Sequence, residues 1–181
     1  VDKSQDTILH LACESGNSAL VKYIADFKII DLESTNSSNE TLLHSAVISG
    51  NIELVKFLNK QKKIDINARA GYQEKTCLHI ACEKNNIEIV RYLVKYLHVD
   101  VTALDSYNSS VLFYACDEGN LDLFKYLQSK GKFDLKATND DGENILHLAC
   151  QSGKFELVDY IIKLKQINIQ DKDNNGGTVL H

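Results

Sequence analysis

The 181-residue sequence predicts an all-α solenoid of stacked helix-turn-helix units with projecting β-hairpin or loop fingers. The main observation is a recurring pattern of one small polar residue, two apolar residues and, in all but one copy, histidine. The pattern occupies residues 7–10, 41–44, 76–79, 110–113, 144–147 and 178–181, so the step is 34 residues apart from one step of 35. A Gly or Asn break and a second apolar segment follow each of the earlier copies. A period of this length indicates repeated supersecondary units and not one closed core.

The unit that starts at Thr41 shows how the first helix is predicted. Thr41 is a candidate N-cap, because its hydroxyl can accept a hydrogen bond from a backbone N–H group of the first helical turn. A helix of about two turns is expected over 42–49, with apolar residues on one face. Gly50 and Asn51 then end this helix, because these residue types most readily adopt the left-handed conformation of a helix C-terminus.

A second helix is expected from about Ile52 to Lys60, with apolar side chains inward and charged side chains outward. The alternating residues 64–67 and the polar stretch 68–75 predict a projecting loop or hairpin. Each helix is too short to be stable alone in water, so every unit must pack on its neighbours. The same order recurs along the chain, where the breaks between helices are Gly16-Asn17, Gly50-Asn51, Asn85-Asn86, Gly119-Asn120 and Gly153-Lys154.

This order of helix, tight turn, helix and hairpin, with this opening pattern, resembles the ankyrin repeat over essentially the whole chain. The resemblance implies that first helices line a concave face, second helices form the convex back, and hairpins project as fingers. It divides the chain into a partial hairpin at 1–6, five repeats at 7–40, 41–75, 76–109, 110–143 and 144–177, and the start of a truncated sixth at 178–181.

Some positions depart from the family's pattern. The proline that is usual at the second residue of the pattern is absent from every copy, which is expected to lower stability without changing the fold. The step of 35 places an extra residue between the helix 52–60 and the pattern at 76–79. The glycine usually found two residues before the pattern survives only as Gly142 and Gly176. Less regular hairpin tips are therefore expected at the replacements Gln5, Asn39, Glu74 and Asn108.

The resemblance also implies that a protein partner binds the finger tips and the concave face. Tyr72 and Tyr107 are candidate aromatic anchors, and the many acidic side chains favour a partner with a basic surface. The alternative is a polar surface that is simply solvated. The predicted partner-binding residues are Glu14, Ser15, Glu40, Ile48, Tyr72, Lys75, Glu83, Lys84, Tyr107, Asp117, Glu118, Asp140, Asp141, Glu143 and Gln151.

The composition narrows the class of partner. The net charge of −5 argues against binding to nucleic-acid phosphates, which requires a basic stripe. No apolar run approaches the roughly 20 residues that a membrane-spanning helix needs, so no membrane insertion is expected. We expect a monomer or weak end-to-end self-association. The chain begins without methionine and stops within the sixth pattern, which is typical of a fragment cut from a longer repeat protein.

The cysteines and histidines invite a chemical interpretation. Cys13, Cys82, Cys116 and Cys150 occupy one repeat position, and equivalent positions of stacked helices lie roughly 8–10 Å apart. A disulfide needs Cα atoms within about 7 Å, so these residues are predicted to be free thiols in a reducing intracellular compartment, the cytoplasm.

The His-x-x-Cys spacing suggests zinc, but successive histidines stand one repeat apart, too far to share an ion. In the family this histidine bonds the backbone between repeats, which favours a structural role for His10, His44, His79 and His147.

No catalytic, cofactor or metal site is therefore predicted. No cysteine–histidine pair is distinguished from the others, and no phosphate-binding glycine loop is present. The favoured function is a non-catalytic scaffold for protein–protein interaction. The alternatives are a targeting or regulatory arm of an enzyme whose catalytic domain lies outside this chain, and a structural spacer without a ligand.

Overall fold

The computed structural model describes residues 7–26, 31–61 and 64–179. The chain divides into two compact units, Val1–Asp100 and Val101–His181, here named the N-unit and the C-unit. Each unit is described by itself. The described residues form ten α-helices and one π-helix, which confirms the all-α prediction.

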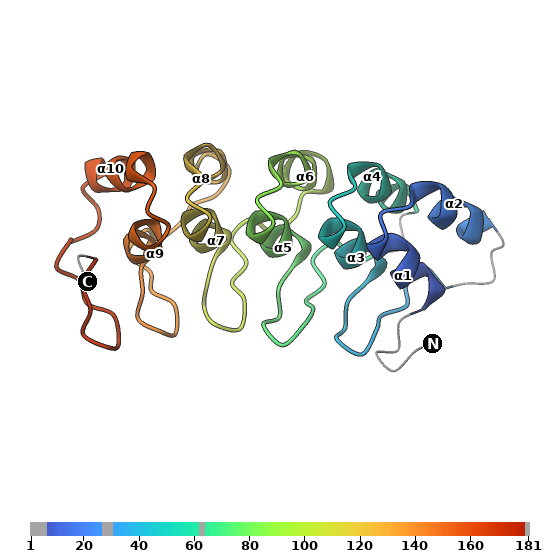
Figure 1. Cartoon of the computed structure of the whole chain (residues 1–181), viewed down its shortest axis with the longest axis horizontal. Coiled ribbons are helices and arrows are strands. Elements are labelled where there is room, and N and C mark those ends of the chain that lie inside the picture. Colours follow the sequence, from blue (N-terminus) through green and yellow to red (C-terminus); the bar gives the residue numbers. More distant parts are fainter. Residues whose placement is uncertain (1–6, 27–30, 62–63, 180–181) are drawn as a thin grey trace. The chain divides into compact units, whose positions relative to one another are not determined.

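The N-unit contains three helix pairs. The first helices are α1 (Ile8–Glu14), α3 (Leu42–Ile48) and α5 (Cys77–Glu83), which pack on one another in one row. The second helices are α2 (Ser18–Asp26), α4 (Ile52–Lys60) and α6 (Ile87–Tyr92), which form a second row (Figure 1). The chain continues from α6 as a π-helix, Leu93–Leu97, and His98 ends it in the left-handed conformation. α4 has the bounds that the sequence predicts for the second helix of the unit starting at Thr41.

The C-unit contains two helix pairs of the same kind. Its first helices are α7 (Val111–Asp117) and α9 (Ile145–Gln151), and its second helices are α8 (Leu121–Gln128) and α10 (Phe155–Lys163). α7 packs on α9 and α8 packs on α10. The rings of Phe124 on α8 and Tyr160 on α10 meet edge to face, with their centroids 6.0 Å apart.

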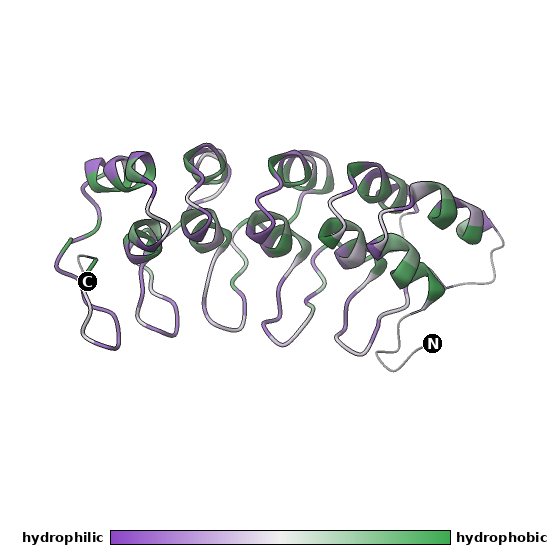
Figure 2. Ribbon diagram, viewed as in Figure 1, coloured by the Kyte–Doolittle hydropathy of each residue, from purple (hydrophilic) through white to green (hydrophobic). Residues whose placement is uncertain are grey.

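The hydrophobic core of each unit lies between and within its helix pairs. Figure 2 shows hydrophobic residues on the helices, whereas the projecting fingers are mostly polar. Leu43, Leu78 and Leu112 on first helices, and Leu58 and Leu127 on second helices, are almost fully buried. Burying one such side chain contributes about 1.5–3 kcal/mol, which the short helices need because they gain little stability from their own hydrogen bonds.

The fingers are closed by isolated antiparallel bridges, and the described residues contain no extended sheet. The bridges join Thr35 to Thr41, Ala70 to Lys75, Leu104 to Ser110 and Lys172 to Thr178. Ala70 and Lys75 are five positions apart in the sequence, whereas the residues of each other bridge are six apart. The extra residue of the 35-residue step lies in the same finger, outside this bridge. Hydrogen bonds also join neighbouring fingers, from Gly71 N–H to Ser38 O in the N-unit and from Asp140 N–H to Tyr107 O in the C-unit.

The expectation of irregular tips at Asn39 and Asn108 is wrong. Both residues have φ of +58°, in the same left-handed region as Gly142 at +76°. Asparagine tolerates this region better than most residues with a side chain. The tip is held instead by a residue five positions before the pattern, whose side-chain oxygen accepts two backbone N–H groups; these residues are Asn36, Asp105, Asn139 and Asp173. The replacement at Gln5 lies outside the described residues.

Candidate partner-binding surface

Histidines at the third helical position hold the first helices in place. The backbone N–H and the hydroxyl of Thr7 both lie beside His10 Nδ1, at 3.4 and 2.9 Å. Because Nδ1 accepts these hydrogen bonds, the neutral ring carries its proton on Nε2. Nε2 is 3.0 Å from Glu40 O, so His10 donates to the backbone directly before the pattern that opens the next repeat. This contact confirms the predicted structural role for His10.

The same capping box occurs at Thr41–His44, Thr76–His79 and Asn144–His147. Burial lowers the pKa of His44, an effect partly opposed by Glu40 and by contacts with the backbone of Lys75 and Ala68. Lowering this pKa keeps the ring neutral, which the acceptor role of Nδ1 requires. The histidines therefore hold the first helices in position, and their own side chains are buried and not available to a partner.

α7 lacks this arrangement, because Phe113 replaces the histidine. Ser110 is the N-cap of α7, but within the described part of the chain its side chain makes no capping hydrogen bond. Phe113 is only 3% exposed and takes the buried position by apolar packing. The start of α7 is consequently held by hydrophobic contact where the other first helices use polar contacts.

The ends of the first helices and the bases of the fingers form one surface in each unit, here named the first-helix face. In the N-unit its exposed members are Glu14, Ser15, Ile48 and Lys84, and Glu40 is half-buried. In the C-unit Asp117, Glu118 and Gln151 are exposed and Glu143 is half-buried. The exposed charged side chains named in the C-unit are both carboxylates, whereas in the N-unit the exposed Glu14 is matched by the exposed Lys84.

Lys75 is not available to a partner in the way that the sequence suggests. Its side chain is only 11% exposed, and Nζ lies 2.7 Å from Glu83 Oε1. The matching positions in the C-unit are Glu143 and Gln151, where Gln151 Nε2 donates to Glu143 Oε1 at 2.6 Å. Both contacts join a finger base to the end of a first helix eight residues later, so the spacing carries a structural tie with different chemistry in each unit.

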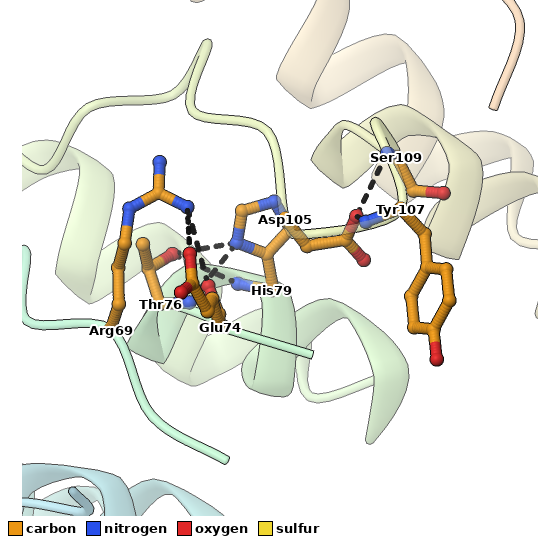
Figure 3. Close-up of polar contacts among 7 residues, drawn as sticks. All are labelled: Arg69, Glu74, Thr76, His79, Asp105, Tyr107 and Ser109. Atoms are coloured by element: carbon orange, nitrogen blue, oxygen red, sulfur yellow. Dashed lines mark hydrogen bonds and ion pairs between the residues drawn. The ribbon is translucent and has the colours of Figure 1, made fainter. Parts of the chain in front are cut away.

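The two predicted aromatic anchors differ in exposure. Tyr72 is 89% exposed, the highest value for a large hydrophobic side chain among the described residues. Tyr107 is half-buried, and its backbone N–H donates to Asp105 Oδ1 at 2.9 Å (Figure 3). Asp105 also accepts from Ser109 N–H and from the Tyr114 hydroxyl. Asp140 and Asp141, on the next finger of the C-unit, are exposed.

The finger that carries Tyr72 has its own construction. Gly71 stands where the other tips have Asn or Asp, with φ of +70°. Ala70 and Lys75 exchange two backbone hydrogen bonds of 2.9 Å, and Arg69 approaches Glu74 (Figure 3). Sequence reasoning missed the tip-holding residues, although their constant place five residues before the pattern was a usable signal. Gly71 breaks that rule at the finger whose bridge joins Ala70 to Lys75.

The thiols are poorly suited to chemistry. All five cysteines are described and all are free, as predicted for Cys13, Cys82, Cys116 and Cys150. Burial raises the pKa of Cys13 to about 12 and raises the pKa of Cys77, Cys82 and Cys116 well above the usual range. Thiolates are the nucleophilic form, so these groups stay inert at neutral pH. Over the described ranges no group of three His, Cys, Asp or Glu side chains could hold a metal ion.

Comparison with known proteins agrees with the geometry. The family described as ankyrin repeats (3 copies) matches residues 1–70, 69–138 and 129–181. The chain belongs to the ankyrin-repeat family. A similar fold occurs in the structure of the Bd0816 predatory endopeptidase from Bdellovibrio bacteriovorus in complex with immunity protein Bd3460. That match has a TM-score of 0.83 and 24% identity, and covers 97% of this chain and 90% of the other.

No curated protein matches the sequence. Among the described residues no helix is long and apolar enough to cross a membrane. Proteins of the ankyrin-repeat family are generally non-catalytic and bind other proteins.

Proposed function

We propose that this ankyrin-repeat chain is a non-catalytic scaffold that binds a partner protein through its first-helix face and its fingers. The observation that carries the proposal is Tyr72, a residue that is 89% exposed at the tip of a finger closed by two backbone hydrogen bonds. A projecting aromatic on a rigid base loses little conformational entropy on binding, and aromatic residues dominate the energetics of protein interfaces.

The electrostatics of the first-helix face select the partner. Asp117 and Glu118 in the C-unit are exposed and carry the negative charge of this face. In the N-unit the exposed Glu14 is matched by the exposed Lys84, and Lys75 is neutralised by its ion pair with Glu83. Negative surfaces attract positive ones and speed their encounter, so the partner presents a basic surface. The buried free thiols agree with an intracellular location, where thiols stay reduced.

The experiment captures partners from a cell extract, identifies them, and titrates the purified partner against variants. We expect Tyr72→Ala to weaken binding at least tenfold. Tyr96→Ala is the matched control, because Tyr96 is a 56%-exposed aromatic of the π-helix that follows a second helix. Equal affinity for wild type and Tyr72→Ala would contradict the role of the finger.

The charge of the partner is tested separately. Asp117→Asn with Glu118→Gln is expected to slow association, and added salt is expected to reduce the difference from wild type. A panel of endopeptidases belongs in the same titration, because a protein of similar fold was solved in a complex containing one. Inhibition of a peptidase would narrow the partner class. If neither set of variants changes the affinity or the association rate of the partner, the partner does not bind the proposed surface.

A further inference from the structure

The second helices pack on one another in the same way within each unit. In the N-unit α4 packs on α2 and α6 packs on α4, and in the C-unit α10 packs on α8. An aromatic residue of the later helix lies at each contact. Asn59 of α4 donates to the Tyr92 hydroxyl of α6 at 3.2 Å, and the Tyr160 ring of α10 meets Phe124 of α8. A second helix therefore has one face for a preceding helix and another face for a following helix.

α2 exposes the face that later second helices turn toward a preceding helix. Leu20 is 41% exposed, whereas the residues at the same repeat position are fully buried, namely Leu54, Ile89, Leu123 and Leu157. Tyr23 is 63% exposed and occupies the repeat position of Tyr92 and Tyr160. Leu20 and Tyr23, here named the α2 face, are thus the residue types with which α6 and α10 pack on their predecessors.

α10 exposes the opposite kind of face, the one that earlier second helices turn toward a following helix. Phe155 is 75% exposed, Ile162 is 45% exposed and Val158 is half-buried. The residues at the repeat position of Val158 are fully buried, namely Val21, Val55, Val90 and Phe124. Spacings of three and four residues put Phe155, Val158 and Ile162 in one stripe, here named the α10 face.

Charge accompanies the packing of second helices inside the N-unit. The pKa of the Lys56 ammonium on α4 is raised first by the hydrogen bond that it donates to Glu53, and further by the charge of Glu88 on α6. A cation of the earlier helix thus faces the acid at the second position of the later helix. Four of the second helices carry such an acid, namely Glu53, Glu88, Asp122 and Glu156.

α10 and α2 both depart from this arrangement, and their departures match. Asp159 stands on α10 where the other second helices have lysine or arginine, and Ala19 stands on α2 where the others have the acid. A following helix with the acid would bring two carboxylates together, whereas Ala19 brings no like charge. Asp159 already pairs with Lys163 at 2.6 Å within α10. The α10 face therefore suits α2 better than it suits the other second helices.

We propose that the α2 face of one copy of this chain packs on the α10 face of a second copy. The contact repeats the packing of α10 on α8, and it buries apolar side chains that each copy otherwise exposes to water. The two faces differ, so the contact is heterologous and a third copy can add to it. First helices are not included, because the segment 177–179 already lies beside Cys150 of α9.

Sedimentation velocity of the purified chain between 10 µM and 1 mM tests the proposal. Two or three side chains on each copy make a small contact, so we expect the mass to rise above the 20.3 kDa monomer with Kd on the order of 0.1–1 mM. Tyr23→Glu and Ile162→Glu are each expected to weaken self-association at least tenfold. Tyr72→Glu is the matched control, because Tyr72 lies on a finger and serves the proposed partner site, and it is expected to associate as wild type does. A wild-type chain that stays monomeric at 1 mM would overturn the proposal.

A mixture of the two variants distinguishes a contact between unlike faces from a contact between like faces. Tyr23→Glu keeps the α10 face and Ile162→Glu keeps the α2 face, so an equimolar mixture is expected to form a dimer with the affinity of wild type and no larger species. Circular dichroism establishes that each variant is folded, and Tyr23→Ala with Ile162→Ala, each expected to weaken association at least threefold, replaces a variant that is not. Wild-type association of either variant alone, or a mixture of folded variants that stays monomeric, refutes the pairing of α2 with α10.

Discussion

α5 and α7 begin at equivalent places in their repeats but are held by different chemistry. At α5 the hydroxyl of Thr76 lies 2.8 Å from His79 Nδ1, and the Thr76 backbone N–H donates to the same nitrogen at 3.2 Å. At α7 Ser110 and Phe113 stand in these positions, and no capping box forms among the described residues. His79 and Phe113 are nevertheless both buried, and both helices span seven residues.

The comparison shows that the buried position can be satisfied in two ways. Histidine satisfies backbone N–H groups that the first turn leaves without partners, and it must stay neutral to do so. Phenylalanine gives up those bonds and gains apolar contact area. Substitutions at the histidine helices should therefore remove hydrogen bonds, whereas substitutions at α7 should remove apolar packing. Four experiments test this difference.

The largest effect is expected from Phe113→Ala. Removing a buried ring leaves a void that the neighbours fill only in part, and such substitutions cost about 3–5 kcal/mol. Urea unfolding followed by circular dichroism would measure the loss. A loss below about 1 kcal/mol would show that the ring is not essential to the packing of α7.

His44→Ala is expected to cost about 2 kcal/mol. The substitution removes the acceptor for Thr41 N–H, which donates to His44 Nδ1 at 3.1 Å, and a buried N–H without a partner carries a penalty. His44→Gln is the control, because glutamine at this position can also reach back to the N-cap backbone. Equal losses in the two variants would show that ring packing, and not the capping bond, is what His44 supplies.

Acid is expected to destabilise the protein through His44. Its pKa is lowered in the folded state, so below about pH 6.5 the unfolded chain binds the proton more readily. The stabilising contribution is therefore complete above pH 6.5 and declines as the pH falls below it. Unfolding free energies at pH 7.5 and pH 5 should differ more for wild type than for His44→Gln, and an identical pH dependence would contradict this assignment.

The smallest effects come from the N-caps themselves. Thr76→Ala is expected to cost about 1 kcal/mol, because the Thr76 side chain accepts the His79 N–H. Ser110→Ala is expected to change stability by less than about 0.3 kcal/mol, because its side chain makes no capping bond within the described residues. Parallel thermal unfolding of both variants gives the difference directly, and equal shifts would remove the contrast between the two helices.

Much of the fold followed from the sequence because the repeat supplies its own internal check. The break at Gly50 and Asn51, the helix that follows, and the free thiols were all predicted from local residue types and spacing. The residue bounds of the individual repeats and the fifteen partner-binding residues remain predictions. Among these residues, Lys75 is mostly buried and Tyr107 half-buried, so their availability to a partner is lower than that of Tyr72.

Local sequence was sufficient for helix starts, helix ends and the stacking period, because caps, left-handed turns and apolar periodicity act over a few residues. Exposure, ion pairing and cavity formation needed the tertiary structure, because they depend on residues brought together from separate segments. Lys75 meets Glu83 only when the finger base lies against the end of α5. A cavity that Phe113 lines likewise exists only because segments on either side of α7 and α8 converge there.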